Sequence, residues 1–298
     1  RFLTGDHWEA RFRARPRGLA SVSPAALPNV EVPDFDGVSL YSGGLDSLIG
    51  ALDTLAGRAR PLFVSHKGDG AVSGPQGALF QAMLEAVARA RPTNRKGPLR
   101  GMRYGLRFER NLIAGSEDTT RGRSFLFLAL GAFAGSGLPA AFSLRIPENG
   151  LIALNVPLDP TRIGSNSTRT THPYYLRRWN ELLGAIGIPG TVTNPYWDRT
   201  KGEMVRRCAM PDQLRELIPL SVSCAHPSLK RFNRDGKSHC GTCVPCVIRR
   251  AAIEAALGAG NDPTGYRCED LTAETLSARS KDGRQIRGFL YALDRLAR

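Results

Sequence analysis

The chain has 298 residues, of which 42% are hydrophobic and 23% are charged, and 41 Lys and Arg against 27 Asp and Glu give a net charge of +14. This composition excludes a disordered chain and a coiled coil, and the charge predicts an anionic partner. The longest apolar run, residues 124–133, is too short to span a bilayer, so we expect a soluble protein with no membrane partner. Because the first residues lack a Met and a signal-peptide apolar region, we expect earlier trimming of the chain and a cytoplasmic location.

The first part of the chain predicts an N-terminal extension followed by a βαβ unit. Residues 7–12 alternate as a strand or hairpin does, and a proline-rich linker continues to residue 36. Four elements then follow one another closely: a strand at 38–41, a turn at 42–47, a helix at 48–56 and a strand at 61–65. This order favours a parallel sheet with covered faces, and therefore an α/β fold.

The rest of the chain continues to alternate between helices and strands. Helices are predicted at 76–90, 124–134, 174–183 and 201–208, and strands at 102–108, at 140–145 and, after a turn, within 184–193. The helix at 124–134 has no polar face, so we expect it to be buried on all sides. Residues 151–160 are expected to form an irregular loop.

Residues 89–110 form a basic segment, in which eight basic side chains stand against one acidic side chain, Glu109. Such a segment is typical of a nucleic-acid-binding surface, but a solvated arginine-rich face explains it equally well. The role of this segment stays open.

The predicted turn between the first strand and the first helix consists of Ser42, Gly43, Gly44, Leu45, Asp46 and Ser47. At such a position, unpaired N–H groups and the helix dipole favour an anion, and the glycines let a phosphate approach the backbone. Ser42 and Ser47 add hydroxyl donors. Asp46 does not suit a pure anion site, so we expect it to hold Mg²⁺ or to cap the helix. The alternative is an ordinary glycine turn with a serine cap.

This turn resembles the SGGxDS signature of the PP-loop ATP pyrophosphatase superfamily at all six positions. The resemblance implies a Rossmann-like parallel sheet of the PP-loop (adenine nucleotide α-hydrolase-like) type that binds ATP and Mg²⁺. It also implies that an acceptor oxygen attacks the α-phosphate, which releases pyrophosphate and forms an adenylated intermediate. We accordingly assign the turn, and Ser65 at the end of the second strand, to ATP.

Four cysteines lie close together late in the chain, namely Cys224, Cys240, Cys243 and Cys246. The two-residue gaps let successive thiolates converge, and four sulfurs suit tetrahedral Zn²⁺ with no open position. We therefore expect a structural zinc in a small helical C-terminal lobe. His226 and His239 lie near enough in sequence to replace a ligand, whereas Cys208 and Cys268 are expected to be buried thiols outside the site.

The turn together with the C…CGxCxxC pattern and the following Arg249 is similar to the QueC family of 7-cyano-7-deazaguanine synthases, over roughly residues 38–255. Members of this family adenylate 7-carboxy-7-deazaguanine with ATP and Mg²⁺, let ammonia displace AMP, and hold zinc with four cysteines. Arg123 begins a segment that resembles the family's Arg-Asn-x-x-Phe-Leu helix start, and Lys201 lies in a Thr-Lys-x-Glu segment. The resemblance implies that Asp46, Arg123 and Lys201 are catalytic, with both cations beside the ATP phosphates. The alternative for each cation is a surface residue.

Other positions depart from the family. Where it has Tyr-Pro-Asp-Cys-Arg, residues 172–176 keep only the proline, and Glu148, Arg169 and His172 form either a different acceptor pocket or an ordinary polar loop. These departures and the N-terminal extension resemble QueC-like paralogues of bacterial antiphage systems such as Qat. That resemblance implies a 7-deazaguanine-type substrate and a partner protein of a defence operon whose amine replaces ammonia.

The sequence therefore leads to one main hypothesis and two alternatives. The main hypothesis is an ATP-dependent enzyme that adenylates a carboxylate and passes it to a nitrogen nucleophile. The alternatives are a PP-loop tRNA-modifying enzyme, which would hold RNA with residues 89–110, and a non-catalytic nucleotide-binding scaffold of a defence complex. The expected organisation is an extension and linker (1–36), a PP-loop ATP-binding domain (37–215) and a zinc-binding helical lobe (216–298).

Overall fold

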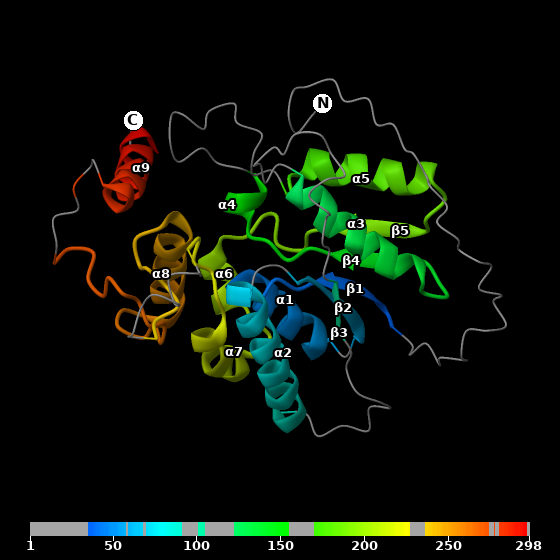
Figure 1. The fold of residues 1–298 in the computed structure, drawn as a ribbon, viewed down its shortest axis with the longest axis horizontal. Helices are drawn as coiled ribbons and strands as arrows, with labels where there is room; N and C mark the ends of the chain where they lie inside the picture. Colours follow the sequence, from blue (N-terminus) through cyan, green and yellow to red (C-terminus); the bar gives the residue numbers. More distant parts are fainter. Residues whose placement is uncertain are drawn as a thin grey trace.

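A parallel β-sheet forms the centre of the protein. The computed structural model describes residues 35–57, 59–67, 70–90, 101–104, 122–154, 170–226, 236–273, 277 and 280–296. Within these residues the sheet has the order β3-β2-β1-β4-β5, and every pair of neighbours is parallel (Figure 1). The strands are β1 (Gly37–Leu40), β2 (Pro61–His66), β3 (Gly101–Tyr104), β4 (Phe142–Arg145) and β5 (Gly190–Thr193). The predicted α/β class is confirmed.

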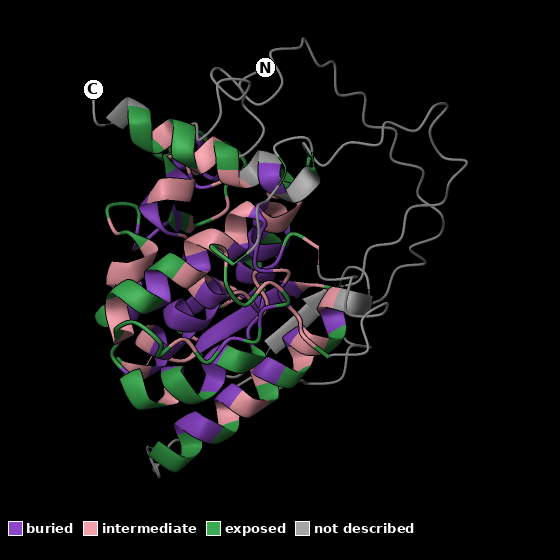
Figure 2. Cartoon of the chain, turned by 90° about the vertical axis from the view of Figure 1, so that its left-hand side faces the viewer, coloured by how far each residue is buried: buried purple, intermediate pink, exposed green. Residues whose placement is uncertain are grey.

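Helices cover both faces of this sheet (Figures 1 and 2). On one face lie α1 (Leu45–Ala56), α2 (Gly70–Ala90), α6 (Lys201–Arg206) and α7 (Pro211–Leu217), and on the other lie α3 (Arg123–Ser136) and α5 (Pro173–Ala185). Among the described residues, one apolar cluster lies on each face of the sheet, and a third, small cluster contains the four cysteines. The remaining helices are the short α4 (Gly150–Ala153), a 3₁₀ turn at Ile218–Leu220, α8 (Val244–Leu257) against α6, and α9 (Lys281–Leu296). No helix in the described ranges is long and apolar enough to cross a membrane.

Several predicted boundaries shift in the structure. The first helix begins at Leu45 and not at residue 48, because Gly44 is its N-cap. The second begins at Gly70, six residues before the predicted start, and contains Pro75 as its sixth residue. The loop predicted at 151–160 is wrong at its beginning, since Asn149 caps the short helix α4 by accepting a hydrogen bond from the Ile152 N–H. The strand predicted at 7–12 and most of residues 89–110 lie outside the described residues.

The prediction that the helix at 124–134 is buried on all sides is wrong. One side of α3 packs on β1, β2 and β4, but Phe125 and Phe133 are 50% and 68% exposed. A helix that covers one face of a sheet turns its other side outward even when that side is apolar. The Phe125 ring lies 4.9 Å from the ring of Trp179 on α5.

Candidate functional site

The predicted phosphate turn lies at the point in the sheet where the strand order changes direction. Strands β2 and β3 lie on one side of β1, and β4 and β5 lie on the other. Because β1 and β4 are neighbours, the turn after β1 and residues 147–149 after β4 meet at the carboxyl edge of the sheet. In open parallel sheets, ligands bind in the crevice at such a switch point. The sequence-predicted turn therefore occupies the position in the fold where a ligand is expected.

Hydrogen bonds within the turn fix its shape. The Ser42 hydroxyl donates to Ser47 Oγ (3.1 Å) and accepts from the Gly44 N–H (3.3 Å), while the Gly43 N–H donates to Ser47 Oγ (3.1 Å). Gly43 has φ +81°, a conformation that L side chains rarely adopt. Gln76 on α2 supports the turn from outside, since its amide donates to the Ser42 carbonyl (3.2 Å). Both serines thus hold the turn in place.

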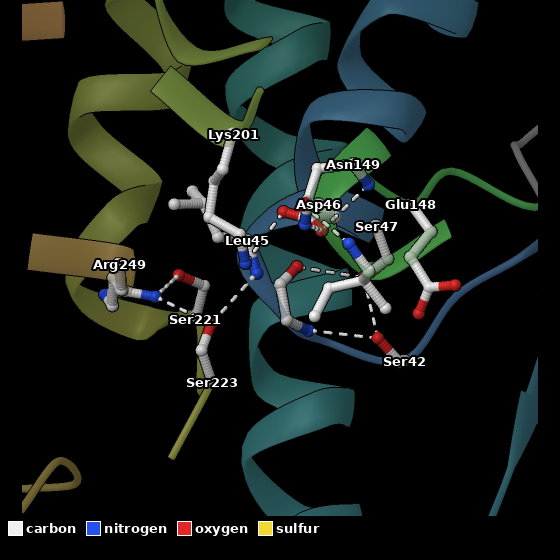
Figure 3. A network of polar contacts seen from close by, with 12 residues as sticks. Ser42, Leu45, Asp46, Ser47, Glu148, Asn149, Lys201, Ser221, Ser223 and Arg249 are labelled. Carbon is white, nitrogen blue, oxygen red and sulfur yellow. Dashed lines mark hydrogen bonds and ion pairs between the residues drawn. The ribbon is translucent and has the colours of Figure 1, made fainter. Parts of the chain in front are cut away.

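Asp46 lies at the centre of a polar network that joins three distant parts of the chain (Figure 3). Its Oδ1 lies 3.0 Å from the Lys201 ammonium, and its Oδ2 accepts from Asn149 through the side chain (2.6 Å) and the backbone (3.3 Å). The side chains of Asp46 and Lys201 are only 14% and 11% exposed. The structure thus brings together two of the three predicted catalytic residues. The alternative role of Asp46 as a helix cap is wrong, because its carboxylate is engaged by Asn149 and Lys201 and not by an N–H group of α1.

The arrangement of Asp46 fits Mg²⁺. Apart from the Lys201 ion pair, the buried Oδ1 accepts no hydrogen bond from any residue that the structure describes. A carboxylate oxygen with a free coordination position is a ligand that Mg²⁺ prefers, and Mg²⁺ is commonly held by one or two carboxylates together with substrate phosphates.

A cavity of about 240 Å³ opens beside the turn, above the ends of β1 and β2. Its lining is mainly apolar and includes Tyr41, Val64, Phe127 and Leu130. Ser42 and Arg123, at the first residue of α3, also line it, so a third predicted residue reaches the same region. A cavity with an apolar wall and a cation at its edge suits a nucleoside joined to phosphate.

Ser65, the remaining residue assigned to ATP, is buried. Its hydroxyl donates to the Tyr41 carbonyl (2.6 Å) and holds the ends of β1 and β2 together. Its contact with a nucleotide stays a prediction.

Glu148 is a partly buried carboxylate beside this network. Its Oε2 accepts from the Thr171 hydroxyl, and Asn194 fixes its backbone through two hydrogen bonds of 3.3 and 2.8 Å. Burial raises the pKa of Glu148 to about 7; the Asp46 carboxylate adds to this rise, whereas the Thr171 hydrogen bond and the Lys201 ammonium oppose it. The second polar residue of the predicted acceptor region, His172, caps α5, and Arg169 lies outside the described residues.

The raised pKa of Glu148 predicts that the free energy of unfolding of the protein depends on pH. A carboxyl whose folded-state pKa lies above its unfolded value of 4.5 stabilises the fold at low pH and loses that contribution as pH rises through about 7. The free energy of unfolding of Glu148→Gln is expected to exceed that of the parent by about 2 kcal/mol at about pH 8, and to be nearly equal to it at about pH 4. Urea unfolding at both pH values measures this difference. Glu85→Gln, on the exposed side of α2, is the control, and an equal response of both variants would contradict the prediction.

The four cysteines meet as the spacing predicts. Their sulfurs all lie within 4.8 Å of one another, with the Cys224–Cys243 and Cys240–Cys246 pairs at 3.9 Å. Hydrogen bonding with the Cys224, Cys243 and Cys246 side chains lowers the pKa of Cys240. Four converging sulfurs, one of them readily deprotonated, fit a structural zinc ion.

His239, Cys208 and Cys268 lie outside the four-cysteine cluster. His239 is not free to replace a cysteine, because its Nε2 accepts from the Ser223 N–H (3.2 Å). Cys208 is buried as predicted, whereas the prediction for Cys268 is wrong, since this thiol is partly exposed. Gly241, with φ +89°, makes the turn between two of the cysteines.

Sequence reasoning missed Asn149 as an Asp46 partner and the role of Arg249. For Asn149 the only signal was its place in a Glu-Asn-Gly segment directly after β4. Arg249 follows the last cysteine by three positions, and it is completely buried. It donates to the Ser221 hydroxyl (2.9 Å), the Ser223 hydroxyl (3.2 Å), the Ile218 carbonyl (2.7 Å) and the Thr264 hydroxyl (3.0 Å).

Comparisons with known proteins give no family for this chain. Neither the scan against protein-family models nor the search of curated proteins finds a match. The resemblance of the turn and the cysteine pattern to known families therefore stays a hypothesis.

Proposed function

We propose that the chain is a QueC-like, ATP-dependent ligase that adenylates a carboxylate and transfers the acyl group to a nitrogen nucleophile. One observation carries this proposal: an SGGLDS turn at the switch point of a parallel sheet, with Asp46 paired to Lys201 and a cavity lined by Arg123 beside it. A parallel sheet that carries this turn after its first strand supports the PP-loop type. The substrate that the sequence resemblance favours is 7-carboxy-7-deazaguanine.

In this proposal each side chain has a distinct task. The cavity takes the adenosine, and the N-terminus of α1 faces the phosphates. Lys201 and Arg123 stabilise the negative charge that grows as pyrophosphate leaves. Asp46 holds Mg²⁺, which when bound neutralises the phosphate oxygens. The four cysteines hold zinc as a structural ion that takes no part in the chemistry.

The reaction has two steps. A carboxylate oxygen of the acid attacks the α-phosphorus of ATP, and the bond to the β-phosphate oxygen breaks. The nitrogen nucleophile then attacks the acyl carbon, the bond to AMP breaks, and the nitrogen releases a proton. Asn149 keeps Asp46 oriented throughout, since it donates to Oδ2 twice.

The nitrogen nucleophile is ammonia or an amine of a partner protein. The departures at residues 172–176 and the N-terminal extension favour a defence operon and a cytoplasmic setting for such a partner. The remaining sequence alternatives, tRNA modification and a non-catalytic scaffold, differ from this proposal in observable products.

The test is a product assay. The protein incubated with ATP, Mg²⁺ and 7-carboxy-7-deazaguanine is expected to release pyrophosphate, and to release AMP once ammonia is added. A mass increase on a co-purified protein would identify a protein amine as the acceptor. No pyrophosphate with any of these nucleophiles would refute the proposal, and nucleotide binding without turnover would support the scaffold.

A further inference from the structure

The phosphate turn is held by a segment of the cysteine-containing lobe. Residues 221–223 run directly beside the turn: the Val222 N–H donates to the Gly43 carbonyl (3.0 Å), and the Leu45 N–H donates to the Ser223 hydroxyl (3.4 Å). This segment precedes Cys224 without a break. Two of the six residues of the turn are thus fixed from a part of the chain almost 180 residues away.

Arg249 holds this segment from its other side (Figure 3). Its guanidinium donates to Ser221 and to Ser223, so the Ser223 hydroxyl lies between Arg249 Nη1 and the Leu45 N–H. Arg249 also lies one helical turn after Cys246 on α8. A continuous series of contacts therefore runs from the cysteine cluster through Arg249 and Ser223 to the N-terminus of α1.

The chemistry of Arg249 supports a specific role in this series. A fully buried guanidinium is costly unless its donors are satisfied, and here the described residues supply neutral oxygens and no carboxylate within ion-pair distance. Burial lowers the pKa of Arg249, and electrostatic interactions with Tyr266, Asp262 and Cys246 partly offset this lowering. An apolar residue would fill the same space at lower cost, so stability alone does not explain a guanidinium here.

We propose that Arg249 is a positioning residue for nucleotide binding, which holds Ser223 against the Leu45 N–H and so couples the metal-binding lobe to the phosphate turn. This inference rests on the proposed ATP site. It predicts that the affinity for ATP depends on side chains that do not touch the nucleotide. The guanidinium acts on the turn through Ser223. Its Nη1 contacts both serines, while its Nη2 and Nε donate to the Ile218 carbonyl and the Thr264 hydroxyl, so the planar group is fixed on all sides.

The experiment measures the Kd of a non-hydrolysable ATP analogue with Mg²⁺ by calorimetry, on protein whose zinc content has been verified. Arg249→Met and Ser223→Ala are each expected to raise this Kd about threefold to tenfold, as the loss of a hydrogen bond does. The double variant is expected to bind no more weakly than Ser223→Ala alone, because both changes interrupt the same series of contacts. Arg249→Lys, which keeps a donor, is expected to restore part of the affinity.

Thr264→Val is the matched control. It removes the acceptor for Arg249 Nε, on the branch of the network that does not lead to the turn, so it is expected to lower the melting temperature while leaving the Kd unchanged. Wild-type affinity in Arg249→Met, a Thr264→Val effect as large as that of Arg249→Met, or simple additivity in the double variant would each overturn the inference. If the parent protein binds no analogue at all, the proposed function itself fails.

Discussion

Replacing Cys246 by Ser is expected to abolish zinc binding and to unfold most of the lobe that holds the cysteines, residues 221–226 and 236–273. The apolar cluster of this lobe consists of the four cysteines and Tyr266. No other buried hydrophobic residue belongs to it within the described residues. The metal site is therefore the core of the lobe, and a lost ligand cannot be compensated by packing.

The size of the effect follows from the energies of structural zinc sites. Zinc binding contributes roughly 10–16 kcal/mol in small zinc domains, whereas an entire domain is stable by about 5–15 kcal/mol. The change is expected to remove most of the hydrogen-exchange protection of the first turns of α8. The Ile253 side of α8, which packs in the main core, is expected to keep more of its protection.

Zinc content, circular dichroism and hydrogen exchange measure this outcome. Cys268→Ser is the matched control, because Cys268 lies in the same lobe but outside the ligand set. It is expected to keep its zinc and its melting temperature. A Cys246→Ser protein that retained zinc and protection would mean that the cluster does not depend on its fourth sulfur. Iron in place of zinc in the parent protein would favour the tRNA-modifying alternative.

The local features of this protein could be predicted from its sequence because they depend on neighbouring residues. A glycine turn between an apolar strand and a helix forms through its own backbone, and Cys240, Cys243 and Cys246 converge because of their spacing alone. The same local reasoning failed for α3, since whether Phe133 is buried depends on what covers the helix, and hydrophobic pattern carries no such information.

The long-range features could not be predicted in this way. Lys201 could be assigned to the site only through a family resemblance, because 155 positions separate it from Asp46 in the sequence and no periodicity links the two residues. The pKa of Glu148 depends on how closely α1, α6 and Thr171 approach it in the folded chain. The role of Arg249 can be recognised only once residues 221–223 are seen to pass between α8 and the turn. That position depends on the packing of the folded chain and not on the local sequence.

Asp46→Asn is expected to reduce pyrophosphate release at least about a hundredfold, which corresponds to ~2.7 kcal/mol of transition-state stabilisation. The amide has nearly the size of the carboxylate and can still accept a hydrogen bond from Asn149, so the turn is expected to keep its shape. What disappears is the charge that binds Mg²⁺ and pairs with Lys201. Zinc content and melting temperature are expected to stay close to those of the parent.

Asp212→Asn is the control for this change, because Asp212 also lies in the first turn of a helix but is exposed. It is expected to release pyrophosphate at the parent rate. Full activity of Asp46→Asn would mean that the turn is not the ATP site, and the proposed function would then lose the observation that carries it.

Nucleotide affinity in the same variant separates an enzyme from a scaffold. Removing the Asp46 carboxylate leaves the Lys201 ammonium, which is almost buried, without its counter-ion, so the positive potential at the turn rises. Without Mg²⁺, ATP is therefore expected to bind Asp46→Asn at least as tightly as it binds the parent, although turnover falls. A scaffold binds ATP in both proteins and releases pyrophosphate in neither. An enzyme releases pyrophosphate in the parent, and Asp46→Asn loses this release while it keeps ATP binding. Calorimetry with ATP alone, followed by the pyrophosphate assay with Mg²⁺, distinguishes the two outcomes when the parent and the variant are compared.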